Sequence, residues 1–312
     1  MKAEGPPRLS PDLLRTCHGR EAWRHWARLS CFVGLYLVAA AAVILAAGRL
    51  SGWQFLLLAP AYLLAGASLH GISLFTHEAV HGTLSRNRFV NNVLGAACAI
   101  PVLQNFSAYQ VLHLRHHAHL GEEGDPDHYA NYTRWSWLVF LMNWARLLVG
   151  YPVYIVAIPI LGLKHGGTKA RLGILAEVAA TALLIAAVWI SPVPAAWVIH
   201  GWLIPMLFIN TMVNIRGMSQ HTLLEEADDE VRGTRSILTA PLVRFFMCNE
   251  NYHLEHHLYP GVPWHHLPRV HEALESGLRE RGAPYIRSYS SFVREFIRVS
   301  LKRSPLGWRD HP

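Results

Sequence analysis

The stretch Asn251-Tyr-His-Leu-Glu-His-His-Leu-Tyr-Pro260 carries three histidines in the pattern H-x-x-H-H. The same pattern occurs once earlier in the chain, and a shorter H-x-x-x-H pattern precedes both. Residues three and four apart share one face of a helix, so each box can direct two or three imidazoles at one point. Imidazole is a good ligand for iron, zinc, copper and nickel. The boxes together predict a nitrogen-rich site large enough for two metal ions, built from His77 and His81, His113, His116 and His117, and His253, His256 and His257.

Long apolar stretches separate these boxes. The chain is 52% hydrophobic and only 16% charged, which is a low charge content for a soluble domain. A helix needs about 20 apolar residues to cross the hydrocarbon core of a bilayer. Four stretches meet this requirement and predict transmembrane spans at residues 29–48, 53–76, 172–191 and 195–215. The first box follows the second span directly, so we expect it at the membrane surface.

Two further apolar segments are expected not to cross the membrane. Residues 89–112 are interrupted by polar side chains, and their longest apolar run is too short to span. Residues 135–163 contain Arg146, and Pro152 and Pro159 disfavour a straight helix. If all boxes share one metal site, they lie on one side of the bilayer, so an even number of crossings separates them. Residues 135–163 are therefore expected to form an interfacial segment or a shallow hairpin.

The distribution of charge predicts the orientation. By itself the net charge of +7 would suggest a nucleic-acid partner, but the basic residues cluster near the apolar spans. Lys and Arg accumulate on the cytoplasmic side of membrane proteins, so we expect a multi-pass protein whose two termini and boxes are cytoplasmic, with no nucleic-acid partner. The predicted organisation is a cytoplasmic N-terminal tail at 1–28, a membrane domain at 29–275 and a cytoplasmic C-terminal tail at 276–312.

In this order, and with apolar spans between them, the three boxes resemble the membrane fatty acid desaturase superfamily, which includes lipid and carotenoid hydroxylases and carotenoid ketolases. The resemblance covers roughly residues 30 to 275. It implies an all-α integral membrane protein with four transmembrane helices, interfacial helices and a cytoplasmic histidine-rich cap that holds a dinuclear metal site. It also implies two iron ions as cofactors and O₂ as co-substrate.

The resemblance adds a ninth ligand. Family members carry an additional ligand histidine just after the span that precedes the third box, and His221 occupies the similar position here. Many relatives end this motif with Glu-His, whereas this chain reads Gln220-His221. The departure concerns the residue beside the ligand and leaves the histidine in place.

The reaction implied by the resemblance is oxidation of a long hydrophobic substrate in the membrane. We favour desaturation of a fatty acyl chain of a lipid. The alternative is a carotenoid hydroxylase or ketolase, because the third-box context through Trp264 resembles both groups. The sequence contains neither a His-Pro-Gly-Gly haem motif nor a four-cysteine iron–sulfur pattern. We therefore expect an external electron donor, such as ferredoxin or a cytochrome b-type protein.

Two other classes of metalloprotein are disfavoured. The first box reads His77-Glu78-Ala-Val-His81, which is also the H-E-x-x-H signature of zinc proteases. An intramembrane protease of that kind usually takes a third ligand from an Asp in a later span, and no later span here contains one. His70 and His200 lie within spans and could be imagined as haem ligands. Neither interpretation accounts for two H-x-x-H-H boxes at span ends.

The segments next to the boxes give weaker signals. The turn Gly124-Asp-Pro-Asp-His128 follows the second box, and its acids either orient ligand imidazoles or form a solvated surface loop. Residues 265–281 predict an amphipathic helix. His119, His265, His266 and His271 lack box spacing and are expected at the surface or behind the ligands.

Overall fold

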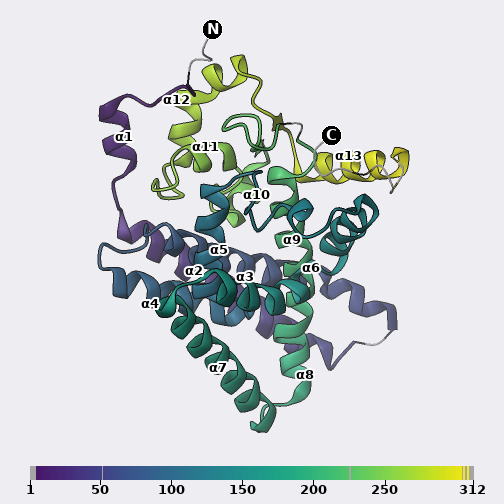
Figure 1. Ribbon diagram of the computed structural model, residues 1–312. Helices are drawn as coiled ribbons and strands as arrows, with labels where there is room; N and C mark the ends of the chain where they lie inside the picture. The colour runs from purple at the N-terminus through teal and green to yellow at the C-terminus, as the bar shows by residue number, and fades with distance from the viewer. Residues whose placement is uncertain (1–4, 51, 225, 304, 306–307, 309–312) are drawn as a thin grey trace. The chain divides into compact units, whose positions relative to one another are not determined.

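Helices dominate the structure because a helix satisfies its own backbone N–H and C=O groups, as an apolar environment requires. The computed structural model describes residues 5–50, 52–224, 226–303, 305 and 308 (Figure 1). Its elements are α1 (Pro11–Cys17), α2 (Ala22–Ala47), η1 (Gly52–Leu58), α3 (Ala59–Val80), α4 (Arg88–Ala99), η2 (Ile100–Val102), α5 (Phe106–Ala118), η3 (Tyr129–Asn131), α6 (Ser136–His165), α7 (Thr168–Ile190), α8 (Ala195–Val198), η4 (Ile199–Leu203), α9 (Ile204–His221), β1 (Ser236–Ile237), α10 (Pro241–Phe246), α11 (His253–Leu258), α12 (Leu267–Glu280), β2 (Tyr285–Ile286) and α13 (Tyr289–Lys302).

The chain divides into two compact units. Unit 1 comprises the described residues of 1–20, 113–148 and 214–312, and unit 2 comprises those of 21–112 and 149–213. Unit 2 contains the bulk of the long apolar helices, and α2 and α3 run side by side within it (Figure 1). Unit 1 contains the second and third histidine boxes, whereas unit 2 contains the first.

Among the described residues, five helical segments are long and apolar enough to cross a membrane: Ala22–Ala47, Gly52–Val80, Ser136–His165, Thr168–Ile190 and Ala195–His221. Four of them contain or overlap the spans expected from the sequence. The predicted count of four is not confirmed, because α6 meets the same criteria of length and hydropathy. The all-α membrane class is supported, and the number of crossings stays a prediction.

Helix α6 coincides with the segment expected to form an interfacial or shallow structure. It is one 30-residue helix with a break at Val149, whose φ of −138° and ψ of 23° are not helical. The break lies three residues before Pro152. A proline ring inside a helix clashes with the carbonyl four residues earlier, which here belongs to Leu148, the neighbour of Val149. The charge of Arg146 is accommodated inside the protein, since its guanidinium lies over the Tyr129 ring at 5.8 Å from the ring centroid.

The segment that leads to the second box is bent. Arg88–Val102 and Phe106–Ala118 meet at an angle of 105°. Leu103, at the break, has a left-handed backbone with φ of 57°. The bend excludes one straight crossing helix. The expectation that residues 89–112 do not cross the membrane stays a prediction, because the two arms together are long and apolar enough for a broken span.

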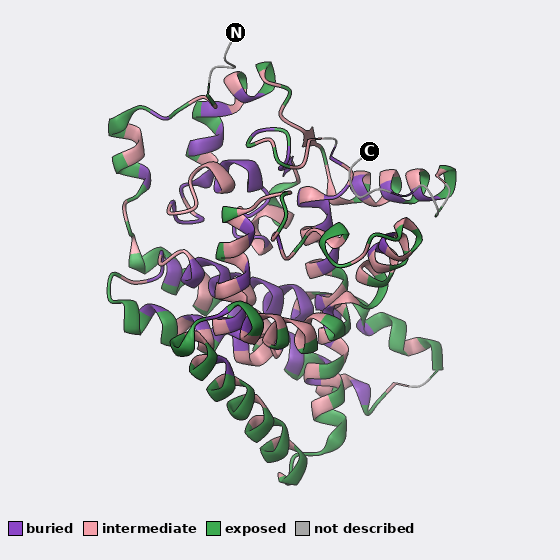
Figure 2. Ribbon diagram, viewed as in Figure 1, coloured by how far each residue is buried: buried purple, intermediate pink, exposed green. Residues whose placement is uncertain are grey.

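Exposure along the apolar helices fits a lipid environment. Only 6% of the most apolar window of α7 is buried, against 56% for the segment Gly52–Val80. Figure 2 shows the same contrast, with α7 exposed along most of its length and α3 largely buried. Exposed leucine, isoleucine and tryptophan side chains on a helix of this length are costly in water and favourable in hydrocarbon.

Unit 1 has its own core around α12. This helix was expected from the spacing of Leu267, Val270, Leu274 and Leu278, and all four side chains are buried in one cluster. Leu9 and Cys17 from the N-terminal segment pack into the same cluster. A second cluster joins Phe292 and Phe296 of α13 to Trp308 and Met218. Both predicted terminal tails therefore contribute side chains to the core of unit 1.

The close approach of α2 and α3 gives a test of unit 2. A methyl group on Gly71 would lie 2.5 Å from the Phe32 ring, which is fully buried and packs edge-on against Phe75. We expect Gly71→Ala to destabilise the protein by about 1–3 kcal/mol through overpacking. The measurement is the thermal unfolding midpoint in detergent.

The matched control for this change is Gly34→Ala on α2. Nothing lies within 4 Å of a methyl group at that position. Replacing glycine by alanine within a helix otherwise favours folding by roughly 0.5–1 kcal/mol. Equal midpoints for the two variants would contradict the predicted contact between α2 and α3.

Candidate metal centre

Helix α5 positions the second box. His113 and His117 are four residues apart, share one face of the helix, and place their Nε2 atoms 3.1 Å apart. His116 points elsewhere and places its Nδ1 atom 2.8 Å from Oδ1 of Asp125. One helical turn therefore presents its imidazoles in two directions.

The short helix α11 positions the third box in the same way. His253 and His257 are four residues apart, and their Nε2 atoms are separated by 3.1 Å. His256 has its Nε2 atom 3.3 Å from that of His117, and its side chain is buried. The third box thus meets the second within unit 1.

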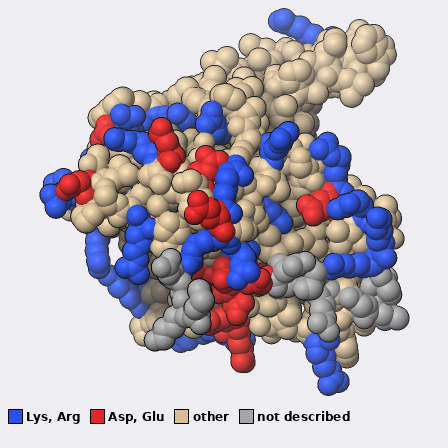
Figure 3. Space-filling model, turned by 90° about the horizontal axis from the view of Figure 1, so that it is seen from above, with Lys and Arg blue, Asp and Glu red and all other residues tan. Residues whose placement is uncertain are grey.

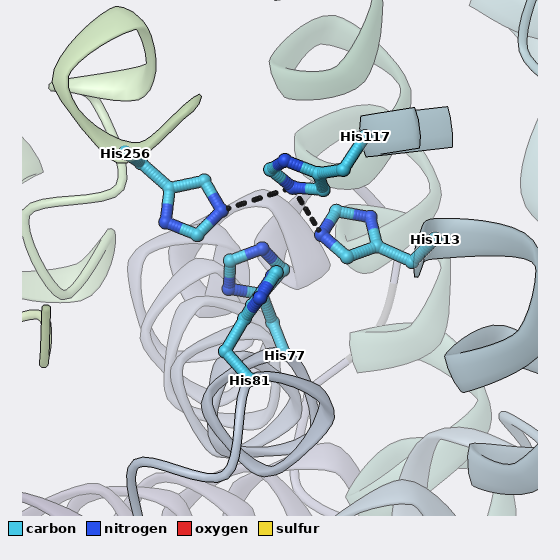
Figure 4. Close-up of side chains that lie close together, drawn as sticks. All are labelled: His77, His81, His113, His117 and His256. Atoms are coloured by element: carbon cyan, nitrogen blue, oxygen red, sulfur yellow. Dashed lines mark hydrogen bonds between the residues drawn. The ribbon is translucent and has the colours of Figure 1, made fainter. Parts of the chain in front are cut away.

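The histidines of unit 1 form two clusters. In cluster A, a ring nitrogen from each of His113, His117 and His256 lies within 4.8 Å of the others, and Figure 4 shows these rings turned toward one another. In cluster B the same limit holds for His116, His221 and His257. His253 joins cluster B, because its Nε2 atom is 3.1 Å from Nε2 of both His221 and His257.

The first box forms a pair within unit 2. His77 lies in the last turn of α3, and His81 caps the C-terminus of that helix. Their ring centroids are 4.9 Å apart, and a ring nitrogen of each lies within 4.8 Å of the other (Figure 4). The pair offers two nitrogen ligands at the end of a largely buried apolar helix.

The hydrogen bonds of cluster B fix which ring nitrogens carry protons. His116 Nδ1–H donates to the carboxylate of Asp125, and His221 Nδ1–H donates to the carbonyl of Gly233 at 3.1 Å. Both partners can only accept when the carboxylate is ionised. When both rings are neutral, their Nε2 atoms are therefore lone pairs that face each other at 3.3 Å. Two lone pairs at this distance repel unless a proton or a metal ion lies between them.

The spacing of the nitrogens suits a metal ion. Two nitrogens bound to one metal at about 2.0–2.1 Å lie roughly 2.9–3.4 Å apart for the angles found in four- to six-coordinate sites. The Nε2–Nε2 separations in the two clusters are 3.1–3.3 Å. The residues present therefore fit a site with two metal ions and mainly imidazole ligands.

Electrostatics act differently on the members of cluster B. Burial lowers the pKa of His221 and so favours its neutral, metal-binding form. At His116 burial acts in the same direction, but the hydrogen bond to Asp125 outweighs it and raises the pKa. Burial, reinforced by the neighbouring imidazoles, holds the pKa of His257 well below its ordinary value. Burial opposes ionisation of Asp125, but its hydrogen bond with His116 outweighs this and lowers the pKa of Asp125. A neutral imidazole backed by an ionised carboxylate is the arrangement that raises the basicity of a metal ligand.

The sequence anticipated part of the support around the ligands. The turn at residues 124–128 does orient a box histidine, because buried Asp125 accepts from His116 and from the backbone N–H groups of Gly121 and Asp127. The carbonyl of Gly233 behind His221 was missed, since a backbone acceptor leaves no signal in the side chains. His200, within a predicted span, forms a hydrogen bond with the Tyr62 hydroxyl. His119 belongs to neither cluster.

Comparison with known proteins identifies the family of the chain. Residues 51–289 match the family described as fatty acid desaturase. The chain is 29% identical to a dihydrorhizobitoxine desaturase of Bradyrhizobium elkanii over 83% of this chain and 77% of that protein. It is 25% identical to an sn-1 oleoyl-lipid 12-desaturase of a Picosynechococcus strain, covering 78% and 76%. It is 26% identical to a beta-carotene ketolase of a Paracoccus strain, covering 64% and 72%.

The family match spans well over half of the chain and includes all three histidine boxes. The relatives add both desaturases and a ketolase, which agrees with the wider superfamily of membrane desaturases and hydroxylases. An oxidoreductase follows from this membership. The chain therefore belongs to the fatty acid desaturase family.

Proposed function

We propose that the protein is a membrane oxidoreductase that desaturates a fatty acyl chain of a lipid with O₂ and two external electrons. The observation that carries the proposal is the convergence of the Nε2 atoms of cluster B at separations of 3.1–3.3 Å, with those of His116 and His221 3.3 Å apart. Such an arrangement suits a metal cation. Oxidation of an unactivated methylene also calls for a metal or an organic cofactor, because side chains alone cannot perform it.

We assign nine histidines to two iron ions. Cluster A would hold one ion through His113, His117 and His256, and the first-box pair, His77 and His81, would supply the two further ligands of the set. Cluster B would hold the other through His116, His221, His253 and His257. The spacing of the nitrogens within each cluster supports this division. Bound iron would supply the oxidising power, drawn from O₂, that removes hydrogen from a methylene.

The overall reaction balances without a further reagent. An acyl –CH₂–CH₂– unit loses two hydrogens and becomes –CH=CH–, while O₂, two electrons and two protons complete the formation of two water molecules. The side chains around the ligands hold their Nε2 atoms directed inward. Asp125 and the Gly233 carbonyl keep protons on the Nδ1 atoms of His116 and His221, so neither ring turns away from the site.

The substrate and the electron donor follow from the surroundings. The apolar helices of unit 2 suit a long hydrocarbon substrate within the membrane. We place both termini and the metal site on the cytoplasmic side, where Lys and Arg are enriched. The face drawn in Figure 3 carries many Lys and Arg side chains among Asp and Glu. A soluble acidic donor such as ferredoxin, or a cytochrome b-type protein, would approach a face of this kind.

A carotenoid hydroxylase or ketolase is the second candidate. It is favoured by the ketolase relative, which matches 64% of this chain. Hydroxylation and desaturation begin with the same removal of hydrogen, so one set of ligands serves both reactions.

The test of function is mass spectrometry of total lipids and pigments. The host should make carotenoids as well as ordinary fatty acids and should co-express ferredoxin and its reductase, with the His256→Ala variant as the inactive control. We expect acyl chains that have lost two hydrogens in cells with the intact protein. Carotenoids that gain oxygen would establish the second candidate. No change in either pool would contradict both.

The ligand assignment is tested by metal content. We expect His256→Ala and His221→Ala each to lower bound iron, because each removes a ligand from one cluster. Each should also lower oxidation activity at least 100-fold, because loss of a residue that only supports a metal ligand already costs about 10- to 100-fold. His119→Ala is the matched control, since His119 follows the second box but joins neither cluster. An iron-replete, active His256→Ala variant would remove the third box from the site.

A substitution at Glu78 distinguishes the proposed oxidoreductase from a zinc protease. The buried carboxylate of Glu78 accepts a 2.7 Å hydrogen bond from the Thr83 hydroxyl and lies between the first-box histidines in sequence. We expect Glu78→Gln to keep its metal and substantial oxidation activity, because an amide can still accept that bond. A proteolytic activity that disappears in this variant would instead indicate the H-E-x-x-H mechanism.

A further inference from the structure

A buried carboxylate lies inside the third box but outside both clusters. Glu255 directly precedes His256 and lies two positions after His253. Its side chain is completely buried in unit 1. A buried carboxylate is costly unless hydrogen bonds satisfy its oxygens. Three side-chain donors converge on it, from Ser236, His271 and Tyr285.

Two of these donors are brought together by the small parallel sheet. Ser236 of β1 is the register partner of Tyr285 of β2. The Tyr285 hydroxyl donates to Oε1 of Glu255 at 2.9 Å, and the Ser236 hydroxyl donates to Oε2. Ser236 also accepts a 3.0 Å hydrogen bond from the backbone N–H of Leu254. The sheet thus holds α11 through both a side chain and the backbone.

The third donor comes from α12. His271 Nδ1–H donates to Oε1 of Glu255, and its Nε2 atom is 3.5 Å from a carboxylate oxygen of Glu275. Its ring stacks on Tyr252, the residue before α11, with centroids 4.6 Å apart and an angle of 29°. Burial and the Glu255 carboxylate raise the pKa of Tyr285, so its hydroxyl stays a donor.

Helix α11 needs such support. It has only six residues, and no side chain caps its N-terminus. So short a helix is not stable by itself, because its few internal hydrogen bonds contribute less free energy than helix nucleation costs. Yet three of its residues present imidazoles to the clusters.

We propose that His271 and Tyr285 are positioning residues that act through Glu255 to hold the third box in its metal-binding orientation. This inference rests on the proposed metal site and does not depend on the substrate. Partners that orient metal ligands typically contribute 10- to 100-fold to metal affinity or activity. His271 and Tyr285 lie 14 or more residues beyond the box, outside its sequence pattern.

The experiment measures the affinity of the purified full-length protein for Fe(II), by competition with a chromophoric chelator in detergent. We expect His271→Ala to weaken binding roughly 10- to 100-fold and Tyr285→Phe about tenfold. His271→Asn should recover most of the affinity, because the asparagine amide N–H lies near the position of Nδ1–H. Tyr285→Phe removes a single oxygen atom and keeps the test valid if His271→Ala does not fold.

The matched control is Tyr36→Phe. Tyr36 is also half-buried and donates one hydrogen bond, to the Gly201 carbonyl at 3.0 Å within unit 2. It should lower the unfolding midpoint of the metal-free protein without changing Fe(II) affinity. Fe(II) affinities of His271→Ala and Tyr285→Phe within twofold of the unmodified protein would overturn the inference and leave the proposed function standing. An unmodified protein that binds no iron would overturn both.

Discussion

The structure depends on one constraint: a neutral imidazole has a single N–H, and in His116 and His221 of cluster B that N–H is already committed to Asp125 and to the Gly233 carbonyl. The remaining lone pairs converge in a buried space, where repulsion is weakly screened. A cation turns this repulsion into coordination.

The ends of helices reinforce this constraint. His77 is in the last turn of α3, His116 and His117 are in the last turn of α5, and His221 ends α9. A helix carries partial negative charge at its C-terminus, where unpaired carbonyls accumulate, so a nearby cation is stabilised by roughly 0.3–1 kcal/mol per helix. The helices that end at these histidines therefore supply both the ligands and partial negative charge that stabilises a cation.

The sequence predicted what local spacing controls. Intervals of three and four residues predicted which histidines share a face of α5 and of α11. The short separation of His116 and Asp125 along the sequence made a hydrogen bond between them predictable. The contacts of Glu255 with Tyr285 and of His221 with Gly233 arise from tertiary packing, which spacing does not encode. The discrepancy at α6 has a similar origin. Arg146 and two prolines argue against a long helix locally, but Tyr129 receives the charge and a break at Val149 absorbs the strain.

Under the proposed function, the apolar helices of unit 2 would select the substrate, whereas the histidine ligands would serve the oxidation. Desaturation and hydroxylation begin with the same removal of hydrogen, so the position of the substrate chain would decide between them. The apolar helices carry a few polar groups, such as partly buried Glu177, which accepts hydrogen bonds from Ser107. An ionisable group within a span is costly and is kept where it serves a purpose. If the proposed function holds, divergence between lipid and carotenoid oxidation on this scaffold would arise from changes among such residues of unit 2, while the histidine clusters of unit 1 stay constant.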